Sequence, residues 1–220
     1  MTQNSSNAGM AESSLLESSV ELRAPQLSDR VLFFEKFLNK GLQISSIVPS
    51  SRYLIQTVLG HVDFDRPSTL VELGGGTGVM TEQVVDRLRP HHRFATVEND
   101  PDFCRILRRR FPEAMLIEGD ATDVAAPLSK LGIDKVDYVL CCLPTPNLPK
   151  RSQIRLMRWL RKSLVPGGLF IQITNAPYYY FNFYRRLFES VSYQMVWLNV
   201  PPGGVYRCAR PRAPFSKPGD

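Results

Sequence analysis

One stretch constrains the fold more than any other, because it joins a buried strand to a helix through a turn dense in glycine. The strand is expected over residues 69–73, and four of the next five residues, 74–78, are glycine. A helix pattern then begins at Val79 and runs over residues 79–88. Glycine lets the backbone adopt conformations closed to other residues and lets a ligand approach the main chain closely. The start of the helix adds free N–H groups for an electron-rich ligand group.

The spacing of the glycines separates this turn from two common nucleotide-binding motifs. A dinucleotide-binding turn reads G-x-G-x-x-G, whereas Val79 stands where the third glycine belongs. The turn also lacks the G-K-[ST] ending of a phosphate-binding P-loop. Glu72, two residues before Gly74, suits a cationic ligand better than a pyrophosphate. The pattern Glu72-x-Gly74-x-Gly76-x-Gly78 resembles the first motif of class I S-adenosylmethionine-dependent methyltransferases, and the alternative is a plain turn in another α/β protein.

Strand patterns alternate with helix patterns along the rest of the chain. Strands are expected over residues 69–73, 94–98, 114–118, 136–141 and 169–174. Helices are expected over residues 79–88, 101–111, 124–131 and 150–164. This alternation predicts a parallel, doubly wound α/β sheet, and two final segments, 191–199 and 205–210, predict an antiparallel hairpin. We therefore expect a Rossmann-like, mostly parallel sheet of seven strands with a C-terminal antiparallel hairpin, as in class I methyltransferases.

Ligands of such sheets bind outside the carboxyl ends of the strands, where two acidic residues are expected. Glu98 closes the second strand, 20 positions after Gly78, and an acid at that distance accepts hydrogen bonds from ribose hydroxyls. Asn99 adds a polar contact. Asp120 follows the third strand and is expected to accept from the adenine amino group, while the Ala121 backbone donates to a ring nitrogen. The alternatives are a surface carboxylate for Glu98 and a helix cap for Asp120.

The resemblance implies S-adenosylmethionine as the cofactor, released as S-adenosylhomocysteine. Glu72 is expected to orient the amino-acid end of this cofactor, directly or through the turn amides. The expected cofactor-binding residues are Glu72, Gly74, Gly76, Gly78, Glu98, Asn99, Asp120, Ala121 and Leu143. A non-catalytic nucleotide-binding scaffold is a further alternative, which these residues disfavour.

The segment after the fourth strand carries information about the methyl acceptor. Adenine N6-methyltransferases have Asn or Asp there, then an apolar residue, Pro and an aromatic residue that stacks on the base. This chain has Cys142 in place of the amine-holding residue and Thr145 in place of the ring. These differences weaken the alternative reading of an rRNA adenine N6-methyltransferase-like enzyme.

Several segments together resemble bacterial phospholipid N-methyltransferases. The matching segments are residues 33–38, 48–51, 71–81, 97–103, 119–121, 143–144, 175–177 and 196–202. Cys142 and Asn175 depart from that pattern, which more often has Gly and Tyr. The resemblance implies methyl transfer to the amine headgroup of a membrane lipid, either phosphatidylethanolamine or an aminolipid such as ornithine lipid. Tyr178, Tyr180 and Asn175 are the candidate catalytic residues, expected to position the amine.

A short helix near the N-terminus is expected to meet the membrane. It runs from Arg30 to Lys40, carries three phenylalanines, and suits an anionic membrane surface; the alternative is a helix docked on the domain. The chain is expected to divide into a disordered tail (1–27), amphipathic and lid helices (28–60), the methyltransferase domain (61–210) and a flexible tail (211–220). Tyr53 is expected to close the site from the second of these helices.

Charge and cysteine content bear on the binding partner and on the presence of a metal site. The formal net charge of +6 favours an anionic partner, and a second basic surface is expected along the helix over residues 150–164; the alternative for that surface is a solvated outer face. The four cysteines lack metal-ligand spacing, so we expect reduced thiols and no metal site. We expect a cytoplasmic protein, peripherally associated with the inner membrane, that binds lipid rather than nucleic acid. The sequence does not indicate an oligomeric state.

Overall fold

The computed structural model describes residues 52–174, 180–199 and 202–213. The expectations for the N-terminal tail, the helix from Arg30 to Lys40, and residues 214–220 lie outside this range. The strands are β1 (Thr69–Leu73), β2 (Arg93–Glu98), β3 (Met115–Glu118), β4 (Val136–Cys141), β5 (Leu164–Thr174), β6 (Phe188–Val196) and β7 (Gly203–Pro211). The helices are α3 (Arg52–Leu59), α4 (Val79–Val85), α5 (Pro101–Arg110), α6 (Ala125–Lys130), α7 (Lys150–Ser163) and α8 (Phe181–Leu187), with a 3-10 turn η2 (Thr145–Asn147).

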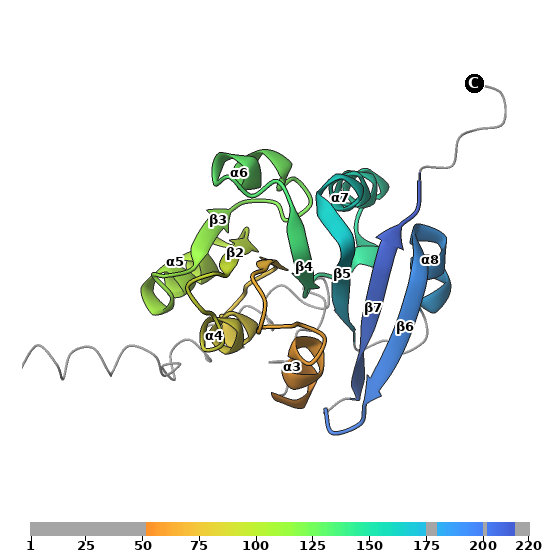
Figure 1. The fold of residues 1–220 in the computed structure, drawn as a ribbon, viewed down its shortest axis with the longest axis horizontal. Helices are drawn as coiled ribbons and strands as arrows, with labels where there is room; N and C mark the ends of the chain where they lie inside the picture. Colours follow the sequence, from red (N-terminus) through yellow and green to blue (C-terminus); the bar gives the residue numbers. More distant parts are fainter. Residues whose placement is uncertain (1–51, 175–179, 200–201, 214–220) are drawn as a thin grey trace, which may run out of the picture.

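The strands form one seven-stranded sheet in the order β3-β2-β1-β4-β5-β7-β6 (Figure 1). Strands β1 to β5 pair in parallel, whereas β7 is antiparallel to both β5 and β6. The predicted fold class, a Rossmann-like class I methyltransferase sheet that ends in an antiparallel hairpin, is therefore confirmed.

Side chains along each central strand point alternately to the two faces of the sheet, so the hydrophobic core has one part on each face. In β1, Val71 and Leu73 pack on the face that α6, α7 and α8 cover, whereas Leu70 packs on the face that α3 and α4 cover. Glu72 shares the side of Leu70, because alternate residues of a strand point to the same face. The sequence period thus places the acidic residue of the first motif beneath α4.

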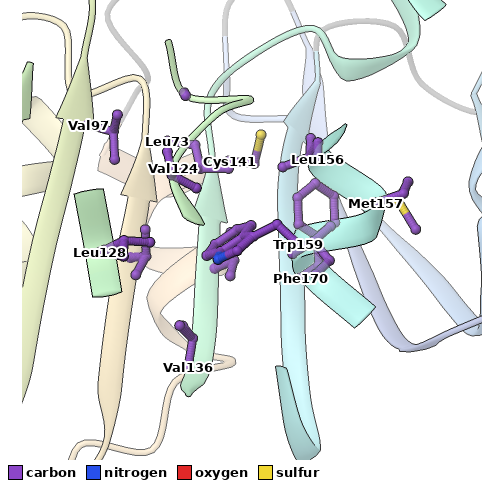
Figure 2. Packing of buried hydrophobic residues seen from close by; sticks show 14 of the residues in the cluster. Leu73, Val97, Val124, Leu128, Val136, Cys141, Leu156, Met157, Trp159 and Phe170 are labelled. Carbon is purple, nitrogen blue, oxygen red and sulfur yellow. The ribbon is translucent and has the colours of Figure 1, made fainter. Parts of the chain in front are cut away.

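Trp159 occupies the centre of the core on the face of α6 and α7 (Figure 2). Its ring comes from α7 and lies between Leu128 and Phe170, in front of β4 (Figure 2). The side chain is only 5% exposed, and burial of a large aromatic ring contributes roughly 2–3 kcal/mol to folding. This packing joins α6 and α7 to the central strands of the sheet.

Three expected elements differ from the structure by three residues or more at one end or both. Strand β5 begins at Leu164 rather than Leu169, because residues 165–168 lie within it as an irregularity in the pairing with β4. Leu164 pairs with Val136 and Leu169 with Tyr138, so the intervening residues have no matching partners in β4. The helix over 79–88 ends at Val85, and the first hairpin strand covers 188–196 rather than 191–199.

Candidate active site

The glycine turn leaves β1 in a conformation that depends on glycine. Gly74, Gly76 and Gly78 have φ angles of 87°, 53° and 85°, in the left-handed region that side chains disfavour. The N–H groups of Gly74 and Gly75 both donate to the carbonyl oxygen of Val97, at 2.9 and 3.1 Å. The turn is therefore tied to the end of β2, the neighbouring strand.

The glycines differ in what surrounds them. A methyl group at Gly78 would lie 2.4 Å from a ring carbon of Phe111, and one at Gly75 would lie 2.5 Å from the Thr96 hydroxyl oxygen. A methyl group at Gly76 would meet no atom within 4 Å. The turn thus packs tightly against the protein on one side and faces open space at Gly76, where its backbone is accessible to a ligand.

Glu98 joins the second strand to this turn. One carboxylate oxygen, Oε2, accepts the Gly76 N–H at 2.8 Å, and the other, Oε1, accepts the N–H groups of Asn99 and Asp100, both at 2.9 Å. A carboxylate offers about four acceptor positions, so these three bonds leave room for a further donor. The Asn99 residue beside it is exposed. The structure thus brings Glu98, Asn99 and Gly76 together at the carboxyl edge of the sheet.

Glu72 lies beneath the turn and is fully buried. Its Oε2 accepts a hydrogen bond of 2.6 Å from the Thr81 hydroxyl in α4. Burial raises the pKa of Glu72 to about 7, an effect that the Thr81 hydrogen bond partly offsets. The carboxyl group therefore fixes α4 to β1, a role that the sequence pattern did not reveal.

Asp120 lies at the end of β3 and takes part in an unexpected ion pair. Its Oδ1 accepts from the Thr122 N–H and hydroxyl, both at 2.8 Å, as in a local turn. Its Oδ2 accepts from Arg155 of α7 at 3.0 Å. Both charged side chains are about half exposed, so the pair is worth little by itself, on the order of 0–1 kcal/mol. Ala121 is buried next to Asp120.

The segment after β4 is fixed by a buried polar network. The Thr145 hydroxyl donates to Gln172 Oε1 at 3.0 Å and lies 2.6 Å from the Tyr184 hydroxyl. Because the Thr145 proton points to Gln172, Tyr184 must be the donor in the second bond. Burial raises the pKa of Tyr184 well above its usual value, so this hydroxyl keeps its proton. Gln172 Nε2 also donates to the Leu143 carbonyl at 2.7 Å.

This network turns Thr145 into the protein. Thr145 is only 4% exposed, so its side chain does not present a surface on which a base can stack. Leu143 instead packs against the glycine turn, since a methyl group at Gly74 would lie 3.0 Å from its Cδ2. Burial raises the pKa of the Cys142 thiol well above its usual value, and nearby Glu72 adds to this effect, so Cys142 is a neutral thiol.

One predicted catalytic residue lies within the described range. Tyr180 is half-buried, and its hydroxyl donates to Asn147 Oδ1 of η2 at 3.2 Å. This bond joins the segment before α8 to the segment after β4. Asn175 and Tyr178 lie outside the described residues.

The basic surface expected on α7 is present and borders a groove. Its members, all of which the structure places at least partly in solvent, are Arg151, Arg155, Arg158 and Lys162. The groove lies between α6 and α7, has a volume of about 530 Å³, and includes Arg155, Arg158 and Lys162 in its lining. Asp123 and Asp134 also line it, so the groove is not uniformly cationic. Arg155 joins this surface to Asp120 at the carboxyl edge.

The sequence did not predict the contacts that three side chains make in the site: Thr81, Gln172 and Arg155. A single polar residue inside an otherwise apolar strand, residues 169–173, was the available signal for Gln172. The basic pattern of the helix over residues 150–164 includes Arg155, but no local pattern indicated its contact with Asp120, which joins residues 35 positions apart.

Comparisons with known proteins agree with this geometry. The chain is 40% identical over 185 residues to a protein of Singulisphaera acidiphila named ornithine lipid N-methyltransferase, covering 83% of this chain and 96% of that protein. It is also 30% identical over 132 residues to ribosomal RNA small subunit methyltransferase A of Chlorobium phaeobacteroides, covering 58% of this chain but only 47% of that protein. A family model described as TrkA-N domain matches residues 75–161.

The fold also matches solved methyltransferases. An O-methyltransferase from Bacillus cereus in complex with S-adenosylhomocysteine superposes with a TM-score of 0.55 at 14% identity, covering 91% of this chain and 100% of that chain. The carboxyl edge fits the same cofactor, because Gly76 opens toward free space and Glu98 retains acceptor capacity. S-adenosylmethionine is therefore the cofactor. The chain belongs to the family of the Singulisphaera ornithine lipid N-methyltransferase, and it is a class I S-adenosylmethionine-dependent methyltransferase.

Proposed function

We propose that the protein transfers methyl groups from S-adenosylmethionine to the amine headgroup of a membrane lipid, with an ornithine-type aminolipid as the first candidate. The supporting relative is 40% identical and aligned over 96% of its length, and its name states ornithine lipid as the substrate of that protein. Phosphatidylethanolamine is the second candidate headgroup.

The observation that carries the proposal is the buried position of Thr145. In an adenine methyltransferase this place holds a ring that stacks on the base, whereas Thr145 is buried and hydrogen-bonded to Gln172 and Tyr184. Cys142, a neutral thiol, is a weak hydrogen-bond partner in the position that would hold an exocyclic amine. The loop lacks both contacts that a purine acceptor requires, which favours an acceptor of another kind.

The positions of three acidic residues support the cofactor roles that we propose for them. Glu98 is the proposed acceptor for the ribose hydroxyls, since it lies at the end of β2 beside the open side of Gly76. Asp120 is proposed to face the adenine amino group while Thr122 and Arg155 hold its orientation. Glu72 acts below the turn, where it fixes α4 and with it the free N–H groups at the start of that helix.

The sulfonium methyl group is already activated, so placing the amine in line with it supplies most of the catalysis. The amine attacks only in its neutral form, and burial under apolar side chains favours that form by lowering the amine pKa. Tyr180 is proposed to position the amine. Its hydrogen bond to Asn147 joins the segment that precedes α8 to the segment that follows β4. Asn175 and Tyr178 are proposed to assist.

The test uses the full chain and S-adenosylmethionine with a labelled methyl group. Detergent micelles containing ornithine lipid, micelles containing phosphatidylethanolamine, and ribosomal RNA are offered in parallel, and the lipids are separated by thin-layer chromatography. Label in a lipid amine supports the proposal, and label in ornithine lipid alone identifies the headgroup. Label in RNA with unlabelled lipid overturns it.

A further inference from the structure

The tip of the β6–β7 hairpin exposes two adjacent large apolar side chains. Trp197 is 72% exposed and Leu198 is 67% exposed. Across the described residues, the other large apolar side chains in this class are Leu131 at 38% and Ile154 at 47%, which are separate from one another in the sequence. Single exposed apolar residues are ordinary, but an exposed tryptophan next to an exposed leucine is unusual.

The tip lies at the same edge of the sheet as the cofactor turn. Strand β7 is antiparallel to β5 and to β6, so β6 runs in the direction of β5 and ends where β5 ends. In register, Thr174 at the end of β5 pairs with Gly204, and Val196 at the end of β6 pairs with Gly203. Figure 1 shows the β6–β7 connection extending beyond the ends of β4 and β5. Trp197 and Leu198 therefore project from the edge that carries the active site.

The base of the tip is firmly held. Val196 and Val205 are buried in the core that α3 covers, and Asn199 is 3% exposed, with its N–H donating to the Val196 carbonyl at 3.3 Å. Gly204 lies directly against the Tyr193 ring, where a methyl group would overlap its hydroxyl. Two exposed apolar side chains on an anchored turn are presented outward instead of folding back onto the protein.

A bilayer has the chemistry that matches this tip. Tryptophan favours the membrane–water interface, because its ring is apolar and its N–H remains hydrogen-bonded to water or headgroups. In the described part of the chain, no helix is both long and apolar enough to cross a membrane. An enzyme that acts on a lipid amine has to bring its active site against the headgroups at the membrane surface.

We propose that Trp197 and Leu198 insert into the interfacial layer of the membrane and bring the carboxyl edge of the sheet against the lipid headgroups. This inference rests on the proposed function, since a lipid acceptor is the reason for contact with a bilayer. It is separate from the expected membrane helix near the N-terminus, because it depends only on described residues. The hairpin orients the active site toward the bilayer.

Fluorescence tests this placement directly, because the chain has two tryptophans and only Trp197 is exposed. The full chain is mixed with phosphatidylglycerol vesicles, which offer no amine acceptor, at about 0.5 M salt to screen basic segments. Trp emission is expected to shift to shorter wavelength and to be quenched when the acyl chains carry bromine. The double variant Trp197→Ser with Leu198→Ser is expected to partition into vesicles at least about tenfold more weakly.

Leu131→Ser is the matched control, because Leu131 follows α6 and lies before β4, at the opposite edge of the sheet. This control variant is expected to bind vesicles like the wild type. The double variant is expected to methylate a short-chain aminolipid dissolved as monomers at the wild-type rate, but to lose activity on the same headgroup in vesicles.

Three outcomes overturn the inference. The first is that the double variant binds vesicles as tightly as the wild type. The second is that Trp197 emission stays unchanged on vesicle binding. The third is that light scattering shows a dimer that shields Trp197 and dissociates in the double variant. Failure of the proposed function looks different, since the wild type then leaves the monomeric short-chain aminolipid unmethylated whatever the vesicle results.

Discussion

The hydroxyl of Thr81 donates a 2.6 Å hydrogen bond to the carboxyl group of Glu72, and this bond joins the first helix after the glycine turn to the strand before it. Both side chains are fully buried. A buried carboxyl group is costly to ionise, which is why burial raises the pKa of Glu72 to about 7. The acidic residue of the first motif is thus a structural support whose charge depends on pH.

Stability is expected to fall as pH rises through neutrality because of Glu72. The folded state holds this proton up to about pH 7, whereas an unperturbed glutamate has a pKa of 4.5. The contribution of this bound proton to the free energy of unfolding is complete below about pH 4.5 and is lost as pH rises through about 7. In urea unfolding of the cofactor-free protein, Glu72→Gln is expected to exceed the wild type by on the order of 3 kcal/mol at pH 8 and to match it at pH 5.

Glu113→Gln is the control for this experiment, because Glu113 is exposed and precedes β3. Its difference from the wild type should be small at both pH values. An equal effect of Glu72→Gln at pH 5 and pH 8 would show that Glu72 does not titrate near neutrality.

The two glycines Gly76 and Gly78 are expected to respond differently to alanine. At Gly78 the new methyl group meets Phe111, and at both positions a left-handed φ disfavours a side chain by about 1–2 kcal/mol. Gly78→Ala should therefore lower the free energy of unfolding more than Gly76→Ala. Gly76→Ala should instead weaken S-adenosylmethionine binding by about tenfold or more, because its methyl group enters the space of the ligand. Calorimetric titration alongside urea unfolding measures both, and equal affinity in Gly76→Ala and the wild type would contradict the assignment.

Glu98 and Glu118 provide a matched pair of carboxylates. They are paired in register at the ends of β2 and β3, but only Glu98 bonds to the glycine turn. Glu98→Ala is expected to reduce S-adenosylmethionine affinity by about tenfold or more, since it removes a charge-assisted acceptor, whereas Glu118→Ala should change it little. Calorimetry measures both variants. Unchanged affinity in Glu98→Ala would remove the ribose assignment.

Gln172 is expected to matter for stability although it lies within an apolar strand. Gln172→Leu removes the donor to the Leu143 carbonyl and one of the two partners of the Thr145 hydroxyl, at an expected cost of about 1–3 kcal/mol. Gln194→Leu, at an exposed position of β6, is the control and should cost little. The midpoints of urea unfolding compare the two, and similar midpoints would show that the network is dispensable.

The sequence predicted the sheet well where local signals and burial agree. The expected bounds of β1 and β4 match the structure to the residue, because each is an apolar run whose ends lie beside turn or charged residues. Glu98 lies beside Gly76 at the carboxyl edge because parallel strands end together.

The remaining features depend on contacts between distant segments. Strand β5 extends back to Leu164, which pairs with Val136 across a break in the register. The Pro-Gly-Gly sequence within this part of the strand gives no local sign of the pairing. Arg155 reaches Asp120 only because the tertiary fold brings its side chain, from α7, to the segment that follows β3. The inward turn of Thr145 likewise requires Gln172 and Tyr184, which come from β5 and α8. Tertiary packing determines these contacts, and the secondary-structure propensities of the residues do not predict them.

The position of β7 between β5 and β6 has a consequence for synthesis of the protein on the ribosome. In the described sheet, β6 is an edge strand whose neighbour is β7, so it emerges with no strand to pair with. Translation adds about 5–20 residues per second, and until residues 203–211 appear the growing chain has unpaired strand edges at both β5 and β6. The last strand therefore completes the sheet in a single step, and a chain cut short before residue 203 is expected to aggregate rather than to persist as a smaller folded domain.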